Sequence, residues 1–145
     1  MAARFDRRAG VQAAAVAVVV VLAIVWAVYK HGEPMGRDEL RIQAQELVWQ
    51  AAEGGALLEL AGHRHVTERF RQEHLQQLRD QAMKTETRLR ESTFEVQFAA
   101  QGHQLRDVAH GLLSELRSPV LVPGALEPLR VQAHAVDEAL PKDPP

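Results

Sequence analysis

The sequence predicts an all-α protein: a single N-terminal transmembrane helix followed by an extracytoplasmic up-and-down helical bundle of three long helices plus one short helix. Three observations predict this class: an uncharged apolar run near the N-terminus, apolar residues at helical spacing through the remainder, and no stretch with the alternation of a β-strand. The expected segments are a cytoplasmic tail (1–10), a transmembrane helix (11–29), a linker (30–37), the bundle domain (38–140) and a disordered tail (141–145).

The apolar run at residues 11–29 has the length and composition of a membrane anchor. It contains 18 apolar residues out of 19, with Gln12 at its edge as the single polar residue. A helix of this length spans about 28 Å, close to the ~30 Å hydrocarbon thickness of a bilayer. Trp26 and Tyr29 suit the distal membrane interface. Residues 1–29 carry a net charge of +2 and the remainder −4, which predicts a cytoplasmic N-terminus.

A cleaved signal peptide is the main alternative for this run, because Val25, Trp26 and Ala27 form a passable cleavage site. The run exceeds the usual length of about 7–15 residues, and the bulky Trp26 lies within the site. A buried core helix does not fit, because the run has no polar face. We therefore expect an uncleaved anchor. The Ala- and Arg-rich, Asn-free composition is typical of a bacterial sequence of high GC content, so the expected location is the bacterial inner membrane with a periplasmic domain.

The first bundle helix is expected between Asp38, as its N-cap, and Gly62, as its stop. Its apolar stripe recurs at alternating steps of four and three residues, as in a heptad. The stripe consists of Leu40, Ala44, Leu47, Ala51, Gly54, Leu58 and Ala61. Gly54 and Gly55 lower the helix propensity, but their small size would permit close approach of a neighbouring helix.

A second, strongly charged helix is expected from about residue 66 to 91. Ser92 and Glu95 then have the spacing of a capping box, in which each side chain accepts a hydrogen bond from the other residue's backbone N–H. This spacing predicts that the third helix begins at Ser92. One continuous helix through Ser92 stays open as an alternative.

The last part of the bundle is divided by prolines. Pro119 ends the third helix, and residues 119–124 suit an extended connector better than a strand. A short fourth helix is expected over residues 126–140, with Pro128 in its first turn and Pro141 as its stop.

Histidines are the only residues that suggest a chemical site. The candidate metal ligands are His63, His65, His74, His103 and His110. Neutral imidazoles together with carboxylates suit Zn²⁺, Cu²⁺ or Ni²⁺, but the chain contains neither Glu-x-x-His nor His-Glu-x-x-His. We therefore assign no metal site. A periplasmic metal-binding or metal- or pH-sensing bundle that uses these histidines stays an alternative.

Composition and motifs argue against several other classes of protein. The chain has no Cys, which excludes disulfides, thiol catalysis and Cys-ligated metals. Its net charge of −2 argues against nucleic-acid binding. It has no glycine-rich phosphate loop, and Ser92 is better explained as a helix cap than as a nucleophile. We expect no enzymatic activity, no cofactor, no nucleic acid and no small-molecule substrate.

The remaining features favour an interaction module, a scaffold or an accessory subunit of an envelope complex. Its expected partners are the lipid bilayer, through residues 11–29, and a protein partner or a homodimer, through the helical stripes. A coiled-coil envelope spacer is a further alternative. The layout resembles, in architecture only, the periplasmic four-helix sensor domains of bacterial receptors. Such receptors need a second membrane span, and no second long apolar run follows the first, so we assign no family.

Overall fold

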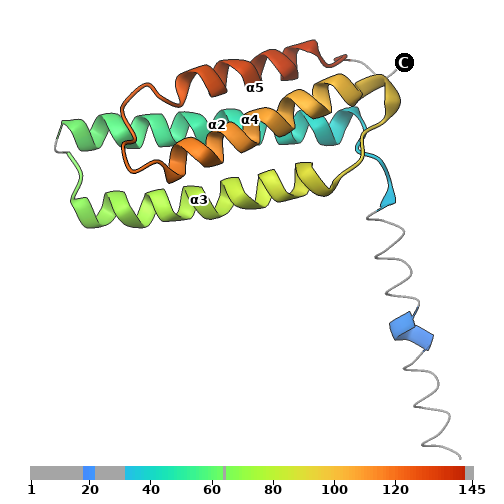
Figure 1. The fold of residues 1–145 in the computed structure, drawn as a ribbon, viewed down its shortest axis with the longest axis horizontal. Helices are drawn as coiled ribbons and strands as arrows, with labels where there is room; N and C mark the ends of the chain where they lie inside the picture. Colours follow the sequence, from blue (N-terminus) through green and yellow to red (C-terminus); the bar gives the residue numbers. More distant parts are fainter. Residues whose placement is uncertain (1–17, 22–31, 64, 143–145) are drawn as a thin grey trace, which may run out of the picture. The chain divides into compact units, whose positions relative to one another are not determined.

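The computed structural model describes residues 18–21, 32–63 and 65–142. The described part of residues 34–145 folds as a bundle of α2 (Arg37–Gly62), α3 (Glu68–Glu91), α4 (Ala99–Arg117) and α5 (Glu127–Ala139), with a 3₁₀ helix, η1 (Val96–Phe98), before α4. Consecutive helices run in opposite directions (Figure 1). The described residues include no β-strand. The predicted all-α class and the helical bundle are therefore confirmed.

The predicted membrane anchor lies mostly outside the described residues. Of residues 11–29 the structure describes only residues 18–21, which are helical valines with exposed side chains. Among the helices of the described ranges, none is both long and apolar enough to span a bilayer. The predicted tail at residues 1–10 is also outside these ranges, and the chain divides into two units, residues 1–33 and 34–145.

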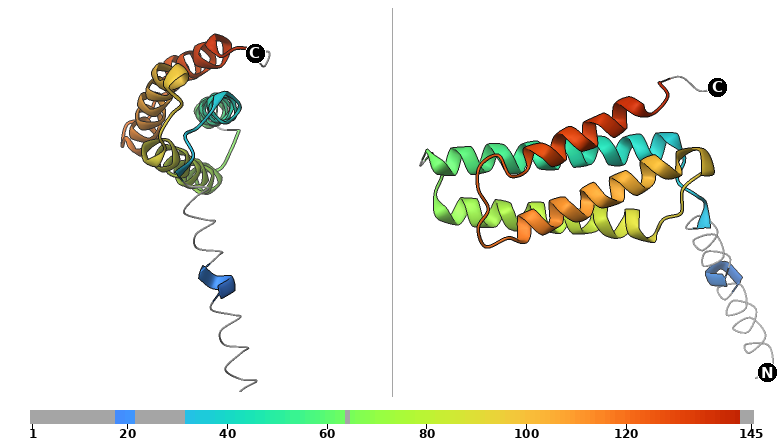
Figure 2. Two further views of the ribbon diagram at one scale, coloured as in Figure 1. Left: turned by 90° about the vertical axis from the view of Figure 1, so that its right-hand side faces the viewer. Right: turned by 45° about the horizontal axis from the view of Figure 1, so that its top comes forward.

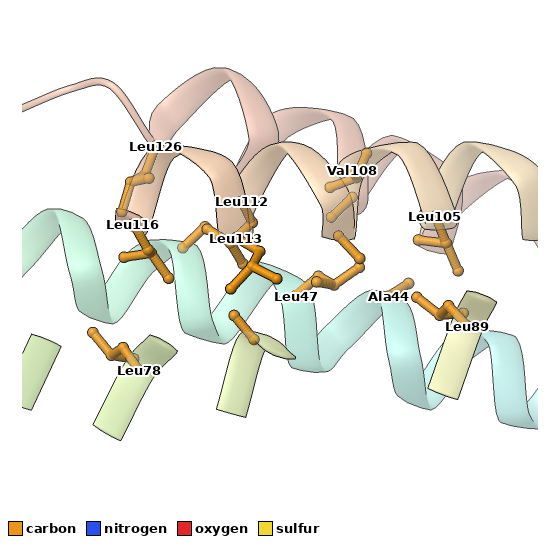
Figure 3. Close-up of a cluster of buried hydrophobic side chains, with 14 of the residues drawn as sticks. Ala44, Leu47, Leu78, Leu89, Leu105, Val108, Leu112, Leu113, Leu116 and Leu126 are labelled. Carbon is orange, nitrogen blue, oxygen red and sulfur yellow. The ribbon is translucent and has the colours of Figure 1, made fainter. Parts of the chain in front are cut away.

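The bundle core is built mainly of leucines from α2, α3 and α4, joined by Ala133 and Val136 of α5. Leu47, Leu78, Leu105 and Leu112 are almost completely buried and point into the space between the helices at successive places along the bundle (Figure 3). Burial of one such side chain contributes roughly 1.5–3 kcal/mol. The stripe predicted for the first helix is buried along its length except at Ala61, which is half-buried. Hydrophobic periodicity therefore identified the face of α2 that packs into the bundle.

A close approach between α2 and the start of α5 occurs at Gly54. A Cβ atom placed on Gly54 would lie 2.6 Å from Cδ1 of Leu126, whereas a Cβ on Gly55 would meet nothing within 4 Å. The expected role of a small residue is confirmed at Gly54, where it lets Leu126 enter the core.

The predicted starts of the first two bundle helices need correction. Asp38 is not the N-cap of α2, because α2 begins at Arg37 and its N-cap is Gly36, which makes no side-chain hydrogen bond. Asp38 lies in the first turn instead, where its carboxylate favours the positive end of the helix dipole. The second helix begins at Glu68, later than residue 66, because the hydroxyl of Thr67 accepts a hydrogen bond from the N–H of Phe70 at 3.2 Å.

The predicted capping box at Ser92 is wrong. Ser92 is the C-cap of α3, and its hydroxyl donates a hydrogen bond to the carbonyl oxygen of Arg88 at 2.6 Å. The next residues stay extended, because Phe94 forms an isolated parallel β-bridge with Met35. The backbone N–H of Met35 donates to the carbonyl oxygen of Thr93 at 2.8 Å. This tertiary pairing separates α3 from α4 and excludes one continuous helix.

The connector after α4 and the final helix agree closely with the prediction from the sequence. Gly124 adopts φ +87° in the connector, a conformation that glycine favours. The final helix, Glu127–Ala139, lies within the predicted range, with Pro128 in its first turn. Arg41 of α2 fixes the end of this helix by donating to the carbonyl oxygens of Leu140 and Pro141, at 3.1 and 2.7 Å.

Candidate interaction surface

α2 carries a second row of residues on the side opposite its buried face. We call this row the outer stripe of α2; it consists of Ile42, Gln45, Trp49, Ala52, Ala56 and Leu60, all exposed. Ile42 is 58% exposed, Trp49 is 55% exposed and Leu60 is 45% exposed. The steps between successive members are three or four residues, so all six side chains lie on one helical face.

The neighbouring helices frame the outer stripe without covering it. α5 lies on one side of α2 and α3 on the other (Figure 2, left). On the α5 side, Arg41 pairs with Asp137, with 3.4 Å between Nε and Oδ1. On the α3 side, Glu53 Oε1 lies 2.8 Å from Nε2 of His74. These polar contacts border the stripe, and its apolar side chains face away from the bundle.

The composition of the outer stripe distinguishes it from an ordinary solvated helix face. None of its six members is charged, and its largest side chains, Ile42 and Trp49, are more than half exposed. Scattered exposed apolar residues are normal, but a contiguous apolar row is typical of an interaction site. The exposed face of α3 shows the usual alternative, with the polar side chains Gln72, Glu73, Gln76, Gln77 and Asp80.

A buried polar cluster joins α2 to α3 beneath this surface. Gln50 donates to Glu46 at 3.1 Å and to the hydroxyl of Thr85 at 3.2 Å, and that hydroxyl donates to Glu46 at 3.1 Å. Gln50 and Thr85 are almost completely buried. Because buried polar groups need partners, the cluster favours one register between the two helices. No periodic pattern of residues predicts this cluster.

The candidate histidines do not converge on one point. The rings of His63 and His65 have centroids 6.1 Å apart near the end of α2, whereas His74 stacks on Phe70 at 5.1 Å and contacts Glu53. In the described ranges, no group of three or more His, Asp or Glu side chains is placed to hold a metal ion.

The two remaining candidate histidines lie along α4. His103 packs edge-on against the ring of Phe94, with 5.5 Å between the ring centroids. His110 has its Nδ1 atom 3.9 Å from Oε1 of Glu86 on α3. Each therefore contacts a different neighbour, and neither lies with the other candidates in a ligand cluster.

A groove between α3 and α4 surrounds Glu86. Its lining residues are Met83, Glu86, Thr87, Arg90, His110, Leu113, Ser114, Arg117 and Ser118. Glu86 is only 8% exposed, and its carboxylate lies between Arg90 at 3.7 Å and His110 at 3.9 Å. Arg90 supplies a positive charge beside this largely buried carboxylate, and the His110 ring lies on its other side. The charged residues that line this groove therefore belong to the contact between α3 and α4.

Among the described residues, the one large pKa shift belongs to Glu68 at the exposed start of α3. Hydrogen bonds from Arg71 and Gln72 lower the pKa of Glu68 from 4.5 to about 2. Similarly, a hydrogen bond from Arg130 lowers the pKa of Glu127 in the first turn of α5. Both carboxylates stay ionised at neutral pH and act at helix N-termini, where negative charge is favourable. They serve helix stability and not the outer stripe.

Comparisons with protein-family models, with curated proteins and with solved structures find no match to this chain. The functional argument therefore rests on the described residues, and the outer stripe of α2 is a row of exposed, uncharged residues that the core does not use. The buried cluster, the Glu86 carboxylate and the helix-start carboxylates each have contacts inside the bundle.

Proposed function

We propose that this chain is a membrane-anchored periplasmic helical bundle that acts as an interaction module, binding another protein through the outer stripe of α2. The outer stripe is the observation that carries this proposal. The bundle buries the opposite face of α2 from Leu40 to Leu58, so the outer stripe is not needed to close the core.

The anchor in this proposal rests on the composition of residues 11–29. The described part of that run, residues 18–21, is helical, and its four valine side chains are at least half exposed. Exposed valines on every side of a helical turn suit a lipid environment better than water. The proposed location is the bacterial inner membrane, with the N-terminus in the cytoplasm.

A binding role also agrees with the arrangement of the candidate chemical residues. The five candidate histidines do not gather in one place; His74 contacts Glu53, for example, and His103 contacts Phe94. Their positions therefore add no support for a metal- or pH-sensing role. Four helices pack side by side in a bundle (Figure 1), which favours a compact module over an extended envelope spacer. We accordingly propose no catalytic role for the chain.

Site-specific photo-crosslinking of the full chain in its native membranes tests the proposal. A photoreactive amino acid at Trp49 should form a protein adduct, because this position is at the centre of the outer stripe. The matched control is the same amino acid at Gln77, an exposed position on the polar face of α3. Equal adduct yields at the two positions, or no protein adduct at Trp49, would contradict the proposed function.

A further inference from the structure

From Ile42 to Ala56, the outer stripe of α2 follows the spacing of a two-helix coiled coil; Leu60 lies at an e position beyond it. Ile42, Trp49 and Ala56 are seven residues apart and occupy the a positions, and Gln45 and Ala52 occupy the d positions between them. All five positions are exposed. A β-branched residue at an a position, such as Ile42, favours two strands.

Burial around the helix agrees with the same register. The g and e positions that flank the stripe are half-buried: Arg41 and Val48 on one side, Glu46 and Glu53 on the other. The b, c and f positions between residues 43 and 54 are buried in the bundle core: Gln43, Ala44, Leu47, Gln50, Ala51 and Gly54. The accessible face of α2 is therefore centred on the a and d positions, where a partner helix would pack.

We propose that the occupant of the outer stripe is a second copy of this chain, packed in parallel with α2 against α2. This inference rests on the proposed function, since it names the protein that binds the same surface. Because the stripe is uncharged from Ile42 to Ala56, pairing it with itself brings no like charges together along the seam.

The charges that flank the seam select the parallel orientation. In a parallel pair, each g position faces the e position five residues later in the partner helix. Arg41 would then face Glu46 of the second copy, a pair of opposite charges. In an antiparallel pair centred near Trp49, e positions face each other, so Glu46 would meet Glu53 of the second copy, a pair of like charges.

Contacts within each bundle already hold the two flanking groups in place. The Nη2 atom of Arg41 donates to the carbonyl oxygens of Leu140 and Pro141, and Oε1 of Glu46 accepts from Gln50 and Thr85. Arg41 Nε also lies 3.4 Å from Oδ1 of Asp137 in its own bundle, so pairing across the seam would add to these internal contacts and not replace them. Parallel packing also places both α2 N-termini at one end, as two anchors in one membrane require; α2 begins eight residues after the predicted anchor.

Disulfide crosslinking of the full chain tests this inference directly, because the natural chain contains no Cys. We expect Gln45→Cys and Ala56→Cys each to form a disulfide-linked dimer with itself, in membranes or in detergent. The matched control is Gln77→Cys on α3, which should remain monomeric under the same oxidation. Circular dichroism of each variant checks that the helices are intact.

A second variant pair tests the apolar contact. Ile42→Glu should convert the dimer to a monomer in sedimentation experiments on the full chain, because it places two carboxylates against each other in the seam. Val131→Glu, which alters an apolar residue of α5 that is 52% exposed, should leave the dimer intact.

Four results would overturn the inference. Disulfides that form only between Gln45→Cys and Ala56→Cys chains would show antiparallel packing. A dimer that persists in Ile42→Glu would place the contact outside the outer stripe. Absence of self-crosslinking, together with an adduct between Trp49 and a different protein, would refute the second copy but leave the proposed interaction function standing. Absence of both would contradict the two proposals together.

Discussion

Leu126, the residue before α5, packs directly against Gly54 of α2, so closely that a Cβ atom on Gly54 would lie 2.6 Å from its Cδ1 atom. Leu126 is 1% exposed and enters the core between α2 and α4 (Figure 3). The contact fixes the connector after α4 to the middle of α2. It also makes a small residue necessary at this one position of a long helix.

Gly54→Ala should destabilise the bundle despite the higher helix propensity of Ala. Overpacking costs about 1–3 kcal/mol, whereas replacing a helical Gly by Ala contributes about 1 kcal/mol. The measurement is urea denaturation of the full chain, followed by circular dichroism. Gly55→Ala is the control, because its new methyl group meets open space, and it should raise stability by about 0.5–1 kcal/mol. A stabilising Gly54→Ala would refute the close contact.

Thr85→Val should cost about 1–3 kcal/mol, because it leaves Gln50 and Glu46 without the hydroxyl that each one contacts. Thermal unfolding of the full chain gives the difference. The control is Thr87→Val on the same helix, at a half-buried position, where we expect a change within about 0.5 kcal/mol. Similar losses in both variants would argue against the buried cluster as a source of stability.

The outer stripe should matter little for folding. Trp49→Ala is expected to change the free energy of unfolding by less than about 1 kcal/mol, since the side chain is 55% exposed. Leu47→Ala, two residues earlier on the buried face, should cost about 2–5 kcal/mol. The measurement is chemical denaturation at low protein concentration, which gives the free energy of unfolding of each variant. A large loss in Trp49→Ala would mean that the stripe serves the core and not a partner.

Acid should weaken the start of α3 over a defined pH range. Hydrogen bonds from Arg71 and Gln72 lower the pKa of Glu68 from 4.5 to about 2. The ionised carboxylate therefore contributes stability fully above about pH 4.5, and this contribution is lost as pH falls toward 2. In an NMR titration, Arg71→Gln should raise the pKa of Glu68 toward 4.5. An unchanged pKa in that variant would contradict the assignment.

The sequence predicted the helices well because their apolar residues recur at helical spacing, and the buried stripe of α2 confirms it. The capping box at Ser92 failed because a local motif was overridden by tertiary pairing of Phe94 with Met35. No pattern within residues 92–95 reports that distant partner. Met35 is only 4% exposed. Its position in the predicted linker likewise did not indicate that it would be buried.

The outer stripe was missed for a different reason. α2 carries two rows at helical spacing, and periodicity alone does not show which row faces the core. Ala52 and Ala56 fit either face, and Gln45 resembles a solvated residue. Likewise, the sequence names His103 and His110 as candidate ligands, but their neighbours, Phe94 and Glu86, are set by the packing of the helices. Only the relative rotation of the helices, which the fold supplies, assigns the faces.

Shielding of Trp49 in the purified full chain, reconstituted into lipid bilayers, tests most directly the central claim that the outer stripe of α2 binds a protein, here a second copy. In a full chain carrying Trp26→Phe, Trp49 is the sole tryptophan, so the fluorescence of this sample reports the outer stripe alone. We predict that acrylamide quenches it weakly, and that the added variant Ile42→Glu makes quenching strong by displacing the partner. Strong quenching of Trp49 to the same extent with and without Ile42→Glu would contradict the account.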